Sequence, residues 1–127
     1  LCSSFTQQAA AAAVAEMVEL DYVNDQRYAE TRAHGLLMAR KSRRAAAQNL
    51  RQKGLDQQQI QQALEQVYAP DEEGRDPELT AACALVESRY LGKLRAGRRD
   101  LVVAALQRRG FAYPVIREAV RQAEEEL

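Results

Sequence analysis

The sequence has few of the residues from which catalytic and metal sites are built. It contains no tryptophan, one histidine and two cysteines in 127 residues. Cys2 and Cys83 show no metal-ligand spacing and have no histidine close to them, so we expect two free thiols in a reducing compartment rather than a disulfide. His34 has no second ligand at metal-binding spacing, which favours a surface position. The sequence also lacks a phosphate-cradling glycine loop and a nucleophile–base pair, so we expect neither enzymatic activity nor a cofactor or metal.

Proline and glycine are also scarce, with three and six residues respectively, which is too few for an all-β protein with many tight turns. Good helix formers dominate instead, and an all-α fold is therefore predicted. No apolar run approaches the roughly 18 residues that a membrane-spanning helix needs. The chain begins at Leu1 and has no basic-then-apolar leader. We interpret it as an expressed fragment or trimmed chain with a cytoplasmic location.

A long internal repeat organises the sequence. The stretch Ser42–Val67 returns 56 positions later, from Arg98 onward, and this shift superposes Leu50 on Leu106 and Gly54 on Gly110. A shift of 50 in the other direction gives a weaker copy near the start of the chain. It places Leu55, Ile60, Ala63, Leu64 and Val67 on Phe5, Ala10, Ala13, Val14 and Met17. Repetition on this scale predicts stacked helical units, each burying its apolar face on a neighbour.

Capping residues divide the chain into seven expected helices, in the order one, three and three. The expected caps are Ser3 or Ser4, Asn24, Ser42, Asp56 and Asp76, with Gly54 and Gly110 as left-handed stops and a last helix from near Pro114. The predicted organisation has the last helix of a truncated first repeat (1–20), a second three-helix repeat (21–69), an acidic linker (70–76) and a third repeat (77–127). These units would form an elongated, curved array. We expect flexibility around the linker.

The formal net charge is zero, but the basic residues are concentrated in two windows. Residues 40–54 hold six cations and no acid, and residues 89–109 hold seven cations with Asp100 as the single acid. We predict a binding face for a partner protein or DNA, consisting of Arg40, Lys41, Arg43, Arg44, Arg51, Lys53, Arg95, Arg98, Arg99, Arg108 and Arg109. A merely solvated basic face is the alternative for each run. Because a basic run stands at the same place in both repeats, we favour binding to a nucleic-acid backbone or to an acidic protein groove.

The aromatic residues argue against base stacking on single-stranded nucleic acid as the main binding mode. They are expected at core or repeat-junction positions rather than on the surface, and they are Tyr22, Tyr28, Tyr90, Phe111 and Tyr113.

Three motifs in order resemble the RecX family, the regulators of the bacterial RecA recombinase. Tyr22–Ala29 (YVNDQRYA) is similar to the family's Gly-Tyr-Leu-Asp-Asp-x-x-Phe-Ala, and Leu50–Leu55 (LRQKGL) to its Leu-Arg-x-Lys-Gly-Ile. Leu106–Ile116 (LQRRGFAYPVI) matches its Leu-x-x-Arg-Gly-Phe-x-x-x-x-Ile. The turn Met38–Ser42 departs from the family's Gly-Tyr-Gly-Pro-like pattern.

The resemblance implies tandem three-helix repeats in a protein that lies in the groove of the RecA filament on single-stranded DNA. There it would inhibit ATP hydrolysis and strand exchange, and so regulate recombination, DNA repair and the SOS response. We expect a non-enzymatic monomer. A helix-turn-helix DNA-binding module without a protein partner is the first alternative. A structural adaptor that docks through apolar faces is the second.

Overall fold

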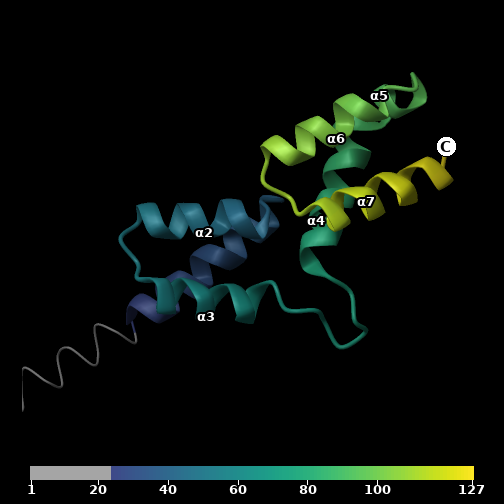
Figure 1. The fold of residues 1–127 in the computed structure, drawn as a ribbon. Helices are drawn as coiled ribbons and strands as arrows, with labels where there is room; N and C mark the ends of the chain where they lie inside the picture. Colours follow the sequence, from purple (N-terminus) through teal and green to yellow (C-terminus); the bar gives the residue numbers. More distant parts are fainter. Residues whose placement is uncertain (1–23) are drawn as a thin grey trace, which may run out of the picture.

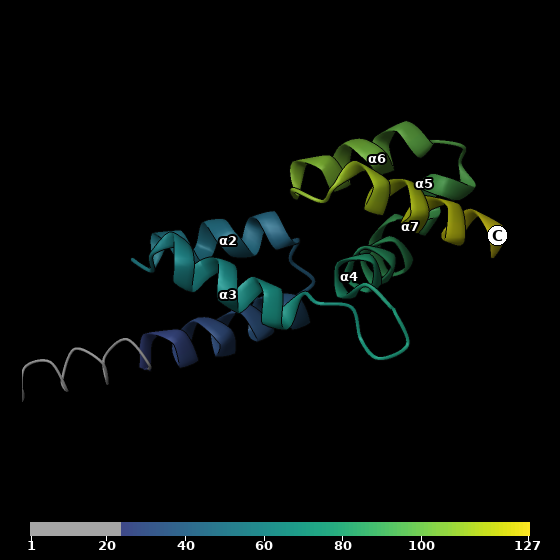
Figure 2. The ribbon, with the colours of Figure 1, turned by 60° about the horizontal axis from the view of Figure 1, so that its bottom comes forward.

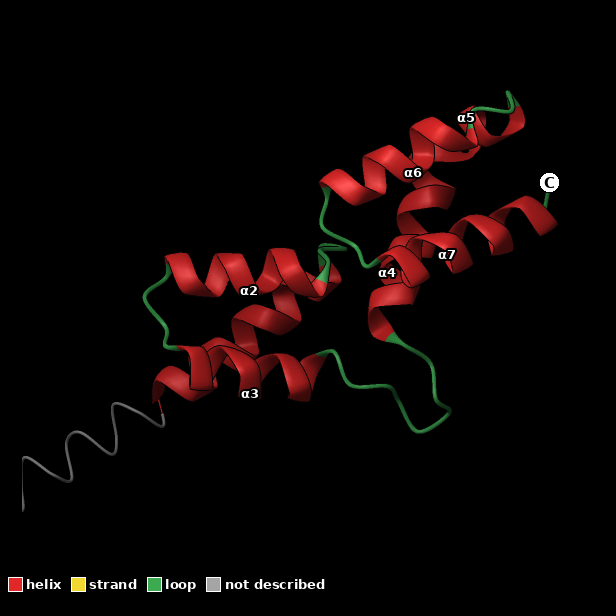
Figure 3. Ribbon diagram, in the orientation of Figure 1, coloured by secondary structure: helices red, strands yellow, loops and turns green. Residues whose placement is uncertain are grey.

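The computed structural model describes residues 24–127, and within this range the chain is helical and has no β-strand. A first helix covers residues 24–38. It is followed by α2 (Arg43–Gln52), α3 (Gln57–Val67), α4 (Pro77–Leu85), a π-helical turn η1 (Val86–Tyr90), α5 (Leu91–Arg95), α6 (Arg99–Arg108) and α7 (Tyr113–Glu125). Figures 1 and 3 show two groups of helices side by side, joined by the long loop between α3 and α4. The predicted all-α fold of tandem three-helix repeats is confirmed. No helix in the described range is long and apolar enough to cross a membrane.

The first unit consists of the helix over residues 24–38, α2 and α3. Ser42 caps α2 by accepting a hydrogen bond from the Ala45 amide, and Asp56 forms a reciprocal capping box with Gln59 at the start of α3. The unit has its own core, in which Leu50 and Ile60, at two repeated positions, are fully buried. Its buried residues are Ala29, Ala33, Ala46, Leu50, Leu55, Ile60, Ala63, Leu64 and Tyr68.

The second unit consists of α4 to α7. Asp76 caps α4, and Pro77 occupies the first turn, where its missing N–H leaves no hydrogen bond unmade. Helices α4, η1 and α5 follow one another without a loop, so the helical segment that begins at Pro77 continues to Arg95. The core lies between α4, α6 and α7. Its largest fully buried side chains are Val86, Val102, Leu106, Ile116 and Val120.

The two cores are separate, and few contacts join them. Leu37, at the end of the first helix, is the one partly buried residue that packs against both cores within the described range. The loop after α6 lies against the start of α2, because the Ser42 hydroxyl donates a hydrogen bond of 2.8 Å to the Arg109 carbonyl. Figure 2 shows the same separation from a second direction. We call the region where the two units meet the unit junction.

Arg40 has an unusual backbone conformation at the unit junction. Its φ of 63° is the only positive φ of a non-glycine residue in the described range. Arg40 stands just beyond the helix over residues 24–38, where the Lys41 amide bonds back to the Leu36 carbonyl. Glycine is favoured at this position of a helix C-terminus, and a side chain there costs roughly 1–2 kcal/mol. A strained arginine therefore occupies this turn.

The helix over residues 24–38 begins differently from the expected one. Residue 24 is already helical, so the expectation that Asn24 precedes the helix as its cap is wrong. The helix predicted to run from Ser3 or Ser4 to about Leu20 lies outside the described residues.

Candidate functional site

The structure divides the predicted basic face into three groups. Six residues meet at the unit junction, because the end of α6 lies against the start of α2. The contact is close: a β-carbon added to Gly110 would lie 3.5 Å from Cβ of Arg44. We call these six residues the junction group: Arg40, Lys41, Arg43, Arg44, Arg108 and Arg109.

The other five predicted residues lie away from the junction. Arg51 and Lys53 are at the far end of α2, about 15 Å along a helix of ten residues. Arg95, Arg98 and Arg99 surround the start of α6, at the end remote from α2. Figure 1 shows α2 and α6 roughly end to end, so the three groups follow one another along this edge of the molecule.

Carboxylates pair with two arginines of the outer group at the start of α6 but form no ion pair with the junction group. Arg98 pairs with Asp100 at 3.3 Å, and Arg99 pairs with Glu124 at 3.3 Å. The hydrogen bond to Arg98 is the main reason why the pKa of the Asp100 carboxyl is lowered. None of the ion pairs found between described residues includes a member of the junction group. Apart from Arg43, whose charge acts on the nearby Glu78 carboxylate, the positive charge of that group therefore remains available to a partner.

Two members of the junction group occupy an unfavourable place on their helix. Arg43 and Arg44 are the first two residues of α2, and the first turn of α2 has no acidic residue. The helix macrodipole is positive at this end, so cations there cost roughly 0.3–1 kcal/mol each. Both side chains are exposed and gain nothing from burial. Helix stability does not explain these arginines, which favours a role in binding.

Glu78 of α4, in the second unit, compensates part of the positive charge at the start of α2. Its carboxylate accepts a hydrogen bond of 3.3 Å from the backbone amide of Arg43, the first residue of α2. Partial burial raises the pKa of Glu78, while the amides of Arg43 and Ala112 act in the opposite direction. The side chain thus lies near the starts of both α2 and α7 and helps to hold the two units together.

Hydroxyl groups, rather than carboxylates, orient two arginines of the junction group. Nη1 of Arg40 donates to the Ser88 hydroxyl at 3.0 Å, and Nε of Arg109 donates to the Tyr90 hydroxyl at 3.2 Å. Ser88 and Tyr90 both belong to η1, and π-helical turns of this kind often mark functional sites. Lys93 lies over the Tyr90 ring, 5.8 Å from its centre. Neutral partners fix the guanidinium groups in place without cancelling their charge.

The sequence did not predict the residues that support this site. Ser42 was predicted as a helix cap, but its bond to the Arg109 carbonyl joins positions 67 apart in sequence. No local sequence pattern marks Ser88 or Glu78 as residues that support the site. The expectation that all aromatic residues lie in the core or at junctions is wrong for Tyr28 and Tyr113, which are 45% and 57% exposed. The sequence argument against base stacking therefore loses part of its basis. His34 is exposed, as expected.

The comparison with protein families identifies the first unit. Residues 24–64 match the family model described as RecX, second three-helix domain. This match supports the assignment of the chain to the RecX family. The RecX match covers the helix over residues 24–38, α2 and most of α3, and it lies within the predicted second repeat. No curated protein and no solved structure gives a significant match to the chain.

The match to a RecX domain bears on the kind of function. A RecX domain suggests a protein that regulates RecA, and RecX proteins are regulators rather than enzymes. Between residues 24 and 127, no three His, Cys, Asp or Glu side chains are placed so that they could hold a metal ion. The candidate functional site is therefore the basic unit junction, part of which lies in the segment that matches the RecX domain.

Proposed function

We propose that this chain is a non-enzymatic regulator that binds the RecA filament on single-stranded DNA and inhibits its ATPase and strand-exchange activities. The observation that carries the proposal is the match of residues 24–64 to the second three-helix domain of RecX. The junction group supports it, because six exposed or half-exposed cations gather there without a carboxylate partner in the described range. Guanidinium groups suit both the acidic side chains of a protein filament and the phosphates of its DNA.

The decisive experiment measures the single-stranded-DNA-dependent ATPase rate of RecA while the chain is titrated in. Inhibition at amounts up to equimolar with RecA is expected. No inhibition by this chain, or by a longer chain that contains it, would overturn the proposal.

Two matched variants test whether the junction group is responsible. The first reverses charge at Arg43 and Arg44, and the second reverses it at Arg98 and Arg99. We predict that the first loses inhibition about tenfold or more, because charge-assisted contacts contribute roughly 1.5–3 kcal/mol each. The second is expected to lose less, since Asp100 and Glu124 already pair with its arginines.

Circular dichroism provides the control for folding in both variants. The helical signal and the melting temperature are expected to persist, because all four side chains are exposed and acidic residues are favourable at helix N-termini. Equal loss of inhibition in the two variants would contradict the assignment to the junction group.

Direct binding to DNA without RecA is the second candidate function. It is favoured by the unneutralised junction group and by α2 and α3, which form two helices joined by a short turn. In this case affinity for bare duplex DNA would fall by about 10³-fold or more between 50 and 200 mM salt if six phosphates were contacted. Fluorescence anisotropy of a labelled duplex measures this dependence. Binding only in the presence of RecA would eliminate the candidate.

A further inference from the structure

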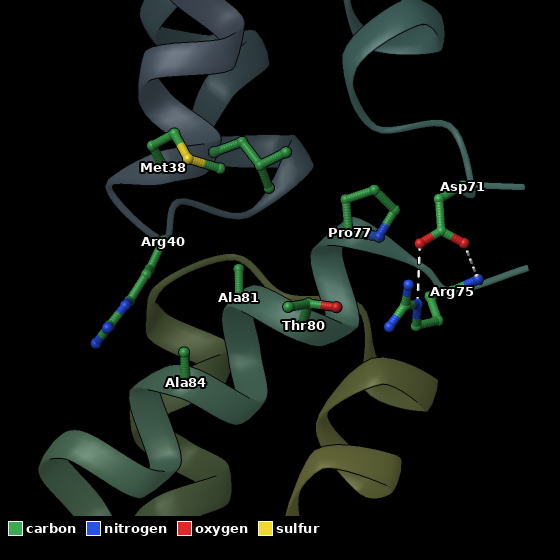
Figure 4. A pocket seen from close by; sticks show the side chains of 9 residues that line it. Met38, Arg40, Asp71, Arg75, Pro77, Thr80, Ala81 and Ala84 are labelled. Carbon is green, nitrogen blue, oxygen red and sulfur yellow. Dashed lines mark hydrogen bonds and ion pairs between the residues drawn. The ribbon is translucent and has the colours of Figure 1, made fainter. Parts of the chain in front are cut away.

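A cavity of about 390 Å³ lies at the unit junction, beside the junction group. Its walls come from three parts of the chain: the end of the helix over residues 24–38, the linker and α4. The lining is largely apolar and includes Leu37, Met38, Pro77 and Ala84. Figure 4 shows Arg40 on one side of the cavity and Asp71 with Arg75 on the other. Its size is within the range of natural ligand sites, roughly 300–1,000 Å³.

Met38 is the most exposed large apolar side chain in the described range. It is 65% exposed, although it stands one residue after Leu37, which packs against both cores. An isolated exposed methionine has no particular meaning, but this one borders an apolar cavity. Methionine is a flexible side chain that adapts to different partners, and it is common at binding surfaces of proteins.

The charged side chains on the two sides of the cavity differ in whether they are already paired within the chain. Asp71 accepts hydrogen bonds from the Glu73 and Arg75 amides, at 2.9 Å each, and from the Arg75 side chain at 3.0 Å. These bonds lower the pKa of the Asp71 carboxyl. Arg75 also pairs with Glu73 at 2.9 Å. Both charges on this side are therefore already balanced within the linker.

Arg40 is in a different situation. Its one side-chain hydrogen bond within the described residues goes to a neutral hydroxyl, that of Ser88, so its charge and other donors remain open. The strained φ of 63° fixes the position from which this side chain extends. Strained residues of this kind are concentrated at ligand-binding sites, where the surrounding structure holds them in place.

We propose that this junction cavity binds an acidic segment of a partner protein, with one apolar side chain seated beside Met38 and a carboxylate paired with Arg40. Charge complementarity points to this occupant, because Arg40 is the one lining charge that the described residues leave unbalanced. The apolar lining favours a protein segment over nucleic acid, whose binding sites consist mainly of phosphate contacts. This inference rests on the proposed function and identifies where the filament protein is contacted.

Photo-crosslinking tests the proposal directly. Benzoylphenylalanine replaces Met38 in one variant and Leu127 in another, and each is irradiated with RecA filaments on single-stranded DNA. Leu127 is a matched control, because it is 52% exposed and lies at the end of the chain remote from the junction (Figure 1). A crosslink to the RecA protein from position 38 but not from position 127 is the expected result.

The other outcomes each overturn the proposal. A crosslink from position 38 to the DNA would show that the cavity faces nucleic acid. Inhibition of the RecA ATPase without any crosslink from position 38 would leave the proposed function intact and reject the cavity as the contact. If neither inhibition nor a crosslink is seen, the proposed function and this inference fail together.

A substitution at Arg40 separates binding from folding. Arg40→Gly removes the guanidinium group and also places glycine where it adopts a positive φ without strain. We expect inhibition to weaken about tenfold while the melting temperature stays the same or rises. Arg117→Ala is the control, because it removes an exposed arginine of α7 that is not part of the basic face. Undiminished inhibition by Arg40→Gly would overturn the role given to Arg40.

Discussion

Gly54 and Gly110 occupy equivalent positions of the repeat, yet substitution by alanine is predicted to affect them unequally. Both have left-handed backbones, with φ of 87° and 90°. An alanine at either position carries a conformational cost of roughly 1–2 kcal/mol. The surroundings differ. A β-carbon at Gly54 would have no atom within 4 Å, whereas at Gly110 it would lie 3.0 Å from the Ser42 hydroxyl oxygen.

Ser42 cannot easily move away from such a β-carbon. It is completely buried, and its hydroxyl donates to the Arg109 carbonyl at 2.8 Å and accepts from the Ala45 amide at 3.1 Å. A shift that breaks one of these bonds costs roughly 1 kcal/mol or more. We therefore predict a loss of about 1–2 kcal/mol for Gly54→Ala and about 2–4 kcal/mol for Gly110→Ala.

Urea unfolding followed by circular dichroism measures both losses, and a double substitution isolates the contact with Ser42. In a Ser42→Ala background the hydroxyl is absent, so Gly110→Ala should cost no more than Gly54→Ala. Equal losses for the two single variants, or an unchanged cost of Gly110→Ala in the Ser42→Ala background, would refute the close packing of α2 on the end of α6.

Two further predictions concern the cores and the junction. Ile60→Ala and Ile116→Ala should each destabilise the chain by about 2–5 kcal/mol in urea unfolding, because their side chains are 2% and 0% exposed, and a loss below about 0.5 kcal/mol would contradict their burial. The raised pKa of Glu78 means that the folded state binds its proton more tightly than the unfolded state does. Stability relative to Glu78→Gln should therefore fall as the pH rises above the ordinary glutamate pKa of 4.5, and the opposite slope in unfolding free energy would refute this.

The fold could be predicted well from the sequence because its signals are local. The caps at Ser42, Asp56 and Asp76 lie where they were expected, and Gly54 and Gly110 both adopt the left-handed conformation of a helix stop. Such signals depend on residues within one helical turn. The helical spacing of apolar residues, to which the buried Ile60 and Ile116 belong, is also a local pattern.

The site could be predicted only in part, because its geometry depends on how the helices pack. Composition identified the basic residues, but the pairing of Arg99 with Glu124 depends on the packing of α6 against α7. The left-handed conformation of Arg40 could not be foreseen, since arginine gives no signal for it. The hydroxyl partners of Arg40 and Arg109 likewise depend on the π-helical turn, which no sequence pattern indicated.

The hydrogen bonds across the unit junction have a consequence for how this surface can evolve. Ser42 is bonded to the main-chain carbonyl of residue 109, and Glu78 to the main-chain amide of residue 43. The contact between the two units therefore depends on main-chain atoms at these two positions, and the side chains there can change without breaking these hydrogen bonds. Mutations at residues 43 and 109 can alter the charge offered to a partner while the arrangement of the two units is retained. Recognition of new partners can in this way diverge without a new fold.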